Sequence, residues 1–201
     1  MTDSYEARER PDELFDLSDC ALKKIPDGTF SLVRVLLKTH LYLHCNSIRN
    51  LESGGKLSDL RGIQVLNLSS NNLSTLPDAL DQLTALRELN LCSNQIDAFP
   101  LSITRLRCLT YLNLEDNRLS SLPPDIGNLK QLVTLLLSKN PLVALPKEVV
   151  LLTKLERLTL PLENMRTPPT GICDQGIDAI FRYFSQVKVI CHNLSKTLRN
   201  C

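Results

Sequence analysis

The sequence is poor in the features that mark several functional classes. It has no Trp, an aromatic content of only 4% and a net charge of +1 at pH 7. A balanced charge argues against nucleic acid or an anionic membrane surface as the partner, because both select a basic surface. Residues 1–10 contain no apolar stretch, and no run reaches the roughly 18 apolar residues of a spanning helix. We therefore expect a cytoplasmic protein with no signal peptide and no membrane span.

Signals for catalysis are also absent. The cysteines are odd in number and scattered, at Cys20, Cys45, Cys92, Cys108, Cys173, Cys191 and Cys201. This spacing indicates reduced thiols rather than a disulfide framework or a zinc module. No phosphate-binding glycine loop or nucleophile-elbow motif occurs. The sequence names no base for Cys92, so we expect no catalytic residue and no cofactor, and we predict that the chain is not an enzyme.

One short segment invites a metal interpretation. His40 and His44 are four residues apart on an expected strand. Four residues of strand span about 13 Å, whereas each nitrogen of a zinc-binding histidine lies about 2.0 Å from the ion. The pair cannot share one ion, so we predict no metal site and interpret both side chains as surface that can contact a partner.

The dominant feature is Leu, which makes up about one residue in five. Leu recurs in the pattern L-x-x-L-x-L-x-x-N-x-L-x-x-L-P, and successive copies start at 63, 86, 109, 132 and 155, always 23 residues apart. Two looser copies precede them, around Phe15 to Pro26 and Leu41 to Leu51. The period predicts an α/β leucine-rich-repeat solenoid, a curved horseshoe of about seven repeats.

Each part of the repeat has a structural meaning. The L-x-L pair predicts a short strand whose leucines share one buried face, so parallel strands should line the concave side. The segments after each proline have the spacing of one helical turn and should line the convex side as short helical or 3₁₀ turns. The asparagine that recurs after each expected strand should form a ladder of side-chain amides between repeats, from Asn46, Asn71, Asn94, Asn117 and Asn140.

The ends of the chain depart from the repeat. We expect a charged segment at 1–11, repeats over 12–170, a capping helix at 171–186 and a poorly ordered tail at 187–201. Ile177, Ile180, Phe181 and Phe184 predict the apolar face of the cap, with Asp174 as its N-cap. The glycine pair in 52–56 predicts a flexible loop excursion between the second and third repeats.

The strand side chains that alternate with the buried leucines form the candidate binding surface. Tyr42 and Tyr111 are the expected anchors, because Tyr supplies contact area at low entropic cost. The full candidate set is His40, Tyr42, His44, Asn67, Glu88, Asn90, Tyr111, Asn113, Glu115, Leu136 and Arg157. We expect a protein partner on this face and a monomeric isolated domain.

Two family resemblances sharpen this expectation. The 23-residue repeats resemble those of intracellular Ras-scaffold proteins. The end segments 12–26, 37–46 and 168–180 resemble the N-terminal region of the leucine-rich repeat and sterile alpha motif-containing E3 ubiquitin ligase family, over roughly 12–186. In that family the repeats recognise targets and a distant RING domain catalyses ubiquitin transfer. This chain has no RING cysteine spacing, so the resemblance implies target recognition without ligase activity.

Three functions therefore remain open. The first is a protein-interaction module, such as the target-recognition region of a ubiquitin ligase. The second is a signalling scaffold that binds a component of a Ras-type GTPase pathway. The third is an N-terminal fragment of an E3 ubiquitin ligase whose RING domain is missing here.

Overall fold

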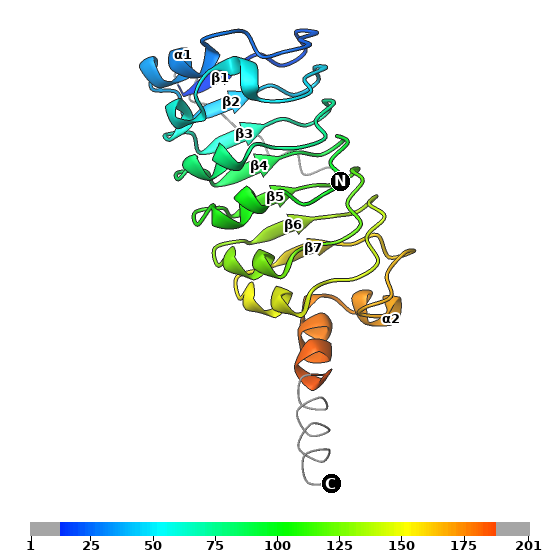
Figure 1. Cartoon of the computed structure of the whole chain (residues 1–201). Coiled ribbons are helices and arrows are strands. Elements are labelled where there is room, and N and C mark those ends of the chain that lie inside the picture. The colour runs from blue at the N-terminus through cyan, green and yellow to red at the C-terminus, as the bar shows by residue number, and fades with distance from the viewer. Residues whose placement is uncertain (1–12, 188–201) are drawn as a thin grey trace.

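The chain forms a single stack of parallel strands. The computed structural model describes residues 13–187. Its seven strands follow one another in a single parallel sheet in chain order, as Figure 1 shows. They are β1 (Leu14–Asp16), β2 (His40–Tyr42), β3 (Val65–Asn67), β4 (Glu88–Asn90), β5 (Tyr111–Asn113), β6 (Thr134–Leu136) and β7 (Arg157–Thr159). The predicted leucine-rich-repeat solenoid is confirmed.

The middle residue of each strand points into one continuous core. Leu66 pairs in register with Leu41 on one side and Leu89 on the other, and all three side chains are buried. A repeat cannot shield its own leucine stripe, because each buried leucine contributes roughly 1.5–3 kcal/mol only once its neighbours exclude water. Stacking is therefore what makes each repeat fold.

Short 3₁₀ turns line the opposite side of the sheet. They are η1 (Glu52–Gly54), η2 (Leu57–Leu60), η3 (Asp78–Gln82), η4 (Leu101–Arg105), η5 (Pro124–Asn128) and η6 (Lys147–Leu151). In the four regular repeats a proline sits directly before the turn with extended backbone, at Pro77, Pro100, Pro123 and Pro146. Proline presets this φ and has no N–H that needs a partner, so the L-P step fixes where the chain turns back.

The asparagine ladder forms as predicted. Asn117 is buried, and its Oδ1 accepts a hydrogen bond at 3.0 Å from the backbone N–H of Ile96 in the preceding repeat. Its Nδ2 donates to the carbonyl of Leu91 in that repeat and to the carbonyl of Leu114 in its own. Each ladder amide thus satisfies backbone groups of two repeats at once. Cys20 holds the same slot in the first repeat, where no earlier described repeat needs such an amide.

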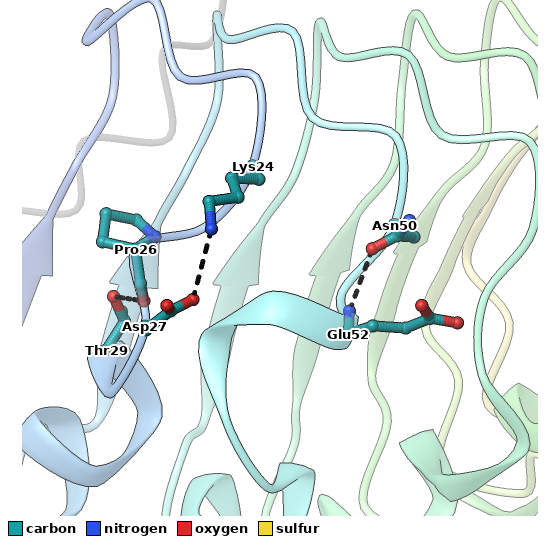
Figure 2. Close-up of polar contacts among 6 residues, drawn as sticks. All are labelled: Lys24, Pro26, Asp27, Thr29, Asn50 and Glu52. Atoms are coloured by element: carbon teal, nitrogen blue, oxygen red, sulfur yellow. Dashed lines mark hydrogen bonds and ion pairs between the residues drawn. The ribbon is translucent and has the colours of Figure 1, made fainter.

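The first two repeats are built differently. Here the α-helix α1 (Thr29–Val35) replaces a 3₁₀ turn, and it begins after Gly28, whose φ is +80°. Figure 2 shows the Thr29 hydroxyl donating to the Pro26 carbonyl at 2.7 Å at this entry. In the next repeat the backbone N–H of Glu52 donates to Oδ1 of Asn50 at 3.1 Å, which opens η1.

The glycine pair does not make a free excursion. Gly54 lies within η1 and is buried, and a Cβ built there would lie 2.5 Å from Cζ of Phe30. Its lack of a side chain lets the chain close onto the Phe30 ring. The expected loop excursion over 52–56 is therefore corrected in part: the segment forms the turn η1, in which Gly54 packs against Phe30, while Glu52, Gly55 and Lys56 are exposed.

Two helical segments cover the last repeat. They are α2 (Thr170–Cys173) and a helix over 177–187, whose residues Ile180 and Phe184 are buried. The expected N-cap at Asp174 is wrong: Asp174 ends α2, and Gly176 at φ +90° separates the two segments. A left-handed glycine interrupts helical geometry, so one predicted helix becomes two. Residues 1–12 and 188–201, with the expected charged segment and nearly all of the expected tail, lie outside the described residues.

Candidate functional site

The concave face is built from two columns of side chains, one on each side of the buried leucines. Parallel pairing in register stacks equivalent residues across the sheet, about 4.8 Å apart. The first column contains His40, Val65, Glu88, Tyr111, Thr134 and Arg157, and the third-position column contains Tyr42, Asn67, Asn90, Asn113, Leu136 and Thr159. All of the candidate residues except His44 and Glu115 lie in these columns, and those two lie two residues after the ends of β2 and β5.

Five candidate residues meet around one depression. The depression has a volume of about 120 Å³ and is lined by Tyr42, Val65, Leu66, Asn67, Glu88, Asn90 and Tyr111. It bridges four strands, from β2 to β5. Val65 and Leu66, which form apolar lining, were not in the predicted set. Their involvement follows from the register, because Val65 lies between His40 and Glu88 in one column.

Glu88 is the charged centre of this depression. Its side chain is partly buried, and this burial raises the pKa of its carboxyl, while the nearby His40 lowers it. Burial is the larger cause, because removal of water disfavours the charged form. Within residues 13–187 no Lys or Arg forms an ion pair with this carboxylate.

The two tyrosines flank this carboxylate from different repeats. Burial raises the pKa of Tyr42, and the carboxylates of Glu88 and Asp16 raise it further. Burial also raises the pKa of Tyr111, against a hydrogen bond from Asn113 that lowers it. Both phenols are therefore neutral near pH 7, and Tyr42 experiences negative potential from two sides.

Three candidate asparagines have a structural role that sequence reasoning missed. Asn67, Asn90 and Asn113 each accept, through Oδ1, a hydrogen bond of 3.0–3.1 Å from the backbone N–H two residues later. These bonds shape the chain as it leaves each strand. Asn113 is in addition only 7% exposed and Leu136 only 6%. Both lie on the expected face but offer a partner little surface.

The remaining candidates lie around the edges. His40 Nδ1 lies 2.8 Å from Oγ1 of Thr39. His44 makes an edge-to-face contact with the Tyr42 ring, with centroids 5.8 Å apart. Arg157 is exposed on the last strand, β7. The eleven candidates therefore divide into a central group at the depression and separate flanking groups.

One side-chain cluster in residues 13–187 has ligand types suited to a metal ion. Asp19, His44 and Cys45 bring one ligand atom each to within 4.8 Å of one another. The stacking of neighbouring repeats brings Asp19 beside Cys45, which sequence spacing alone does not reveal. Sulfur, imidazole and carboxylate together are ligands that zinc accepts. Asp19 and Cys45 are both exposed, so the cluster is open to solvent.

A second hollow lies between the last strand and the C-terminal cap. Its volume is about 420 Å³, and leucines and isoleucines dominate its lining, which also includes Cys173 and Asp174. Burial is the main cause that raises the pKa of the Cys173 thiol. A thiol whose pKa is raised is a poor nucleophile, so this hollow has the character of imperfect packing under a lid. All five described cysteines are free.

Comparison with known proteins gives consistent matches. Residues 39–96 match a family model described as leucine rich repeat, and residues 108–129 match a second model of the same description. Over 74 residues the chain is 40% identical to the E3 ubiquitin-protein ligase LRSAM1 of Mus musculus. That match covers 36% of this chain and 10% of the ligase, so most of the ligase lies outside the comparison.

Solved structures share the architecture. A leucine-rich-repeat protein of Leptospira interrogans is 31% identical with a TM-score of 0.59, over 76% of this chain and 43% of that one. The leucine-rich repeat domain of the type III effector XopL is 27% identical with a TM-score of 0.65, over 74% of this chain and 51% of that one. In the part of the chain that the structure describes, no helix is both long and apolar enough to cross a membrane.

Proposed function

We propose that this chain, a leucine-rich-repeat protein whose repeats are related to those of LRSAM1, binds a partner protein on its concave face. One observation supports this most directly: Tyr42, Glu88 and Tyr111, from three different repeats, line a single depression in that face. Half-buried aromatic side chains at the centre of a rigid surface are the usual anchors of protein interfaces. We place the interaction in the cytoplasm, where free cysteines persist.

The rigidity of the sheet supports binding rather than catalysis. Backbone hydrogen bonds hold every strand in register, and the ladder asparagines tie consecutive repeats together. A preorganised surface loses little conformational entropy when a partner docks. No pair of nucleophile and base is arranged at the depression, where the titratable side chains are two phenols and one carboxylate.

Target recognition for a ubiquitin ligase is the finer proposal. The 40% identity to LRSAM1 falls within the repeats, and the match covers only a tenth of that ligase's length. We propose that the chain supplies recognition and that ubiquitin transfer belongs to other domains. Incubated with ubiquitin, its activating enzyme and a panel of conjugating enzymes, the chain should form no ubiquitin chains. Chain formation would contradict the non-catalytic assignment.

Concave-face binding is tested with a matched pair of variants. Tyr42→Ala combined with Tyr111→Ala removes both anchors, while Tyr183→Ala removes a tyrosine of the C-terminal helix over 177–187. Proteins captured by the unaltered chain should be retained by the Tyr183 variant and lost by the double variant. Circular dichroism checks that both fold. If the double variant, folded, captures the same proteins as the unaltered chain, the partner does not bind at this face.

A further inference from the structure

The depression on the concave face also indicates what its occupant is. We infer that it receives the guanidinium of an arginine side chain presented by the partner protein. This inference rests on the proposed function, because it specifies the chemistry of the same surface. The evidence is the size of the depression, the unmatched carboxylate, the two aromatic walls and the local charge.

Its size fits one side chain. The volume of about 120 Å³ is well below the roughly 300–1,000 Å³ of pockets that enclose small-molecule ligands. The depression lies on an otherwise extended sheet face, so the rest of a partner can lie over the neighbouring strands. A single projecting side chain that enters from a larger protein surface matches this shape.

A positively charged group of the partner would stabilise the Glu88 carboxylate. It is partly buried and lacks an ion-pair partner within residues 13–187. A carboxylate partly removed from water gains more from a cation than an exposed one, because the surroundings screen the interaction less. A guanidinium presents paired N–H donors in a planar fork that matches the two carboxylate oxygens.

The rest of the lining suits arginine equally well. Tyr42 and Tyr111 both line the depression, and contacts between a guanidinium and tyrosine rings favour Arg over Lys. Val65 gives an apolar contact for the methylene stem, which long basic side chains bury while the charged end stays polar.

The local charge excludes the opposite occupant. Asp16 on β1 pairs with Tyr42 and so extends the third-position column. Across β1 to β4, the charged residues of the two columns are Asp16 and Glu88, and His40 is the one titratable base. Both carboxylates raise the pKa of Tyr42, which places negative potential at the Tyr42 side of the depression, while Glu115 and Arg157 shift the pKa of Tyr111 in opposite directions. A carboxylate or phosphate of a partner would be repelled there.

A small probe tests this without the partner. N-acetyl-arginine amide is titrated into the full chain labelled with ¹³C on the tyrosine rings, with N-acetyl-citrulline amide as the uncharged match. The chain has four tyrosines, so few ring signals need assignment. We expect saturable shifts of Tyr42 and Tyr111 with the arginine probe, no shift of Tyr183, and much smaller shifts with citrulline.

Two isosteric variants supply the control. Glu88→Gln should weaken arginine binding about tenfold, because it removes the charge and keeps the shape. Glu52→Gln removes an exposed charge in η1 on the convex side, away from the depression, and should leave binding within a factor of about two. Equal binding of citrulline, or equal loss in both variants, would overturn the inference.

The probe and the pull-down can fail separately. Arginine binding with unchanged protein capture by the Tyr42 and Tyr111 double variant would remove the proposed function and keep the chemistry of the depression. Lost capture in that variant, with no probe binding at saturating concentration, would keep the function and overturn the arginine assignment.

Discussion

The central repeats and the two N-terminal repeats both bury their leucines against neighbouring repeats, but they differ in how regularly the strands are spaced along the chain. From β3 to β7 the strands start at 65, 88, 111, 134 and 157, a constant step of 23 residues, whereas the first two steps, from 14 to 40 and from 40 to 65, are 26 and 25. The longer steps accommodate α1 and η1 on the convex side. They also leave apolar residues in the solvent, namely Leu32 at 52%, Val35 at 68%, Leu36 at 51% and Leu37 at 83% exposure.

The comparison shows what a constant period achieves. Identical steps put every proline, leucine and ladder asparagine beside its equivalent, so each side chain is buried by copies of itself. In the irregular region the equivalents are offset, and burial is less complete: Asn46 is partly exposed, while Asn71, Asn94, Asn117 and Asn140 are buried. We therefore expect the central region to be more sensitive to loss of a side chain, and the N-terminal region to depend on particular contacts.

The largest effect is expected from a core leucine at equivalent positions of the two regions. Leu114, directly after β5, is fully buried, whereas Leu17, the equivalent residue directly after β1 and four repeats away, is only partly buried. Leu114→Ala should cost about 2–5 kcal/mol of unfolding free energy, because neighbouring repeats hold the cavity open. Leu17→Ala should cost less. Urea unfolding followed by circular dichroism measures both, and equal losses would contradict the difference between the regions.

A smaller effect is expected in the asparagine ladder. Asn117→Ala leaves the buried N–H of Ile96 without its partner and removes one of the two amide donors to the Leu91 carbonyl, the other being Asn94, which should cost about 2–3 kcal/mol. Asn46 makes the same kind of bonds, to Leu22 and Leu17, but is partly exposed. Water can replace its amide, so Asn46→Ala should cost about 1 kcal/mol. Thermal unfolding of both variants compares them, with the exposed Asn72→Ala as the reference.

The regular part of the fold was predictable from sequence for the same reason. When a pattern repeats at a constant spacing, aligning its copies also aligns the equivalent residues of neighbouring strands. The strands, the asparagine ladder and the turns that follow each proline can therefore be predicted from the spacing of Leu, Asn and Pro. The predictions that were wrong concern segments outside the regular 23-residue period. Asp174 looked like an N-cap because the apolar stripe begins three residues later, and the effect of Gly176 depends on a φ that composition does not specify.

The candidate site was predictable only as a surface. Alternation along each strand identified which side chains point outward. It did not indicate that Val65 and Glu88 would join the tyrosines in one depression, or that Asn67 would bond its own backbone. Nor did it reveal that Asp19 lies beside Cys45. These outcomes depend on side-chain rotamers and on contacts between repeats about 25 residues apart, which a local pattern does not contain.

The most specific effect concerns Gly54 in the irregular region. A Cβ at this position would lie 2.5 Å from Cζ of Phe30, whose ring is 1% exposed and cannot move aside into water. Gly54→Ala should therefore cost about 1–3 kcal/mol through overpacking. Gly62→Ala is the matched control, because nothing lies within 4 Å of a Cβ built there. Both substitutions restrict the unfolded chain alike, so the difference between their unfolding free energies isolates the clash.

A double variant completes this test. Phe30→Leu shortens the side chain that the new methyl group would meet, so Gly54→Ala combined with Phe30→Leu should lose less than the sum of the two single losses. Urea unfolding of the four variants gives the coupling. Additive losses, or equal costs at Gly54 and Gly62, would show that the Phe30 contact does not hold η1 in place. Coupling would instead show that the irregular repeats depend on one specific contact, between Gly54 and the Phe30 ring, rather than on the repeated contacts of the central stack. Glycine is required at this position because the aromatic ring already fills the space.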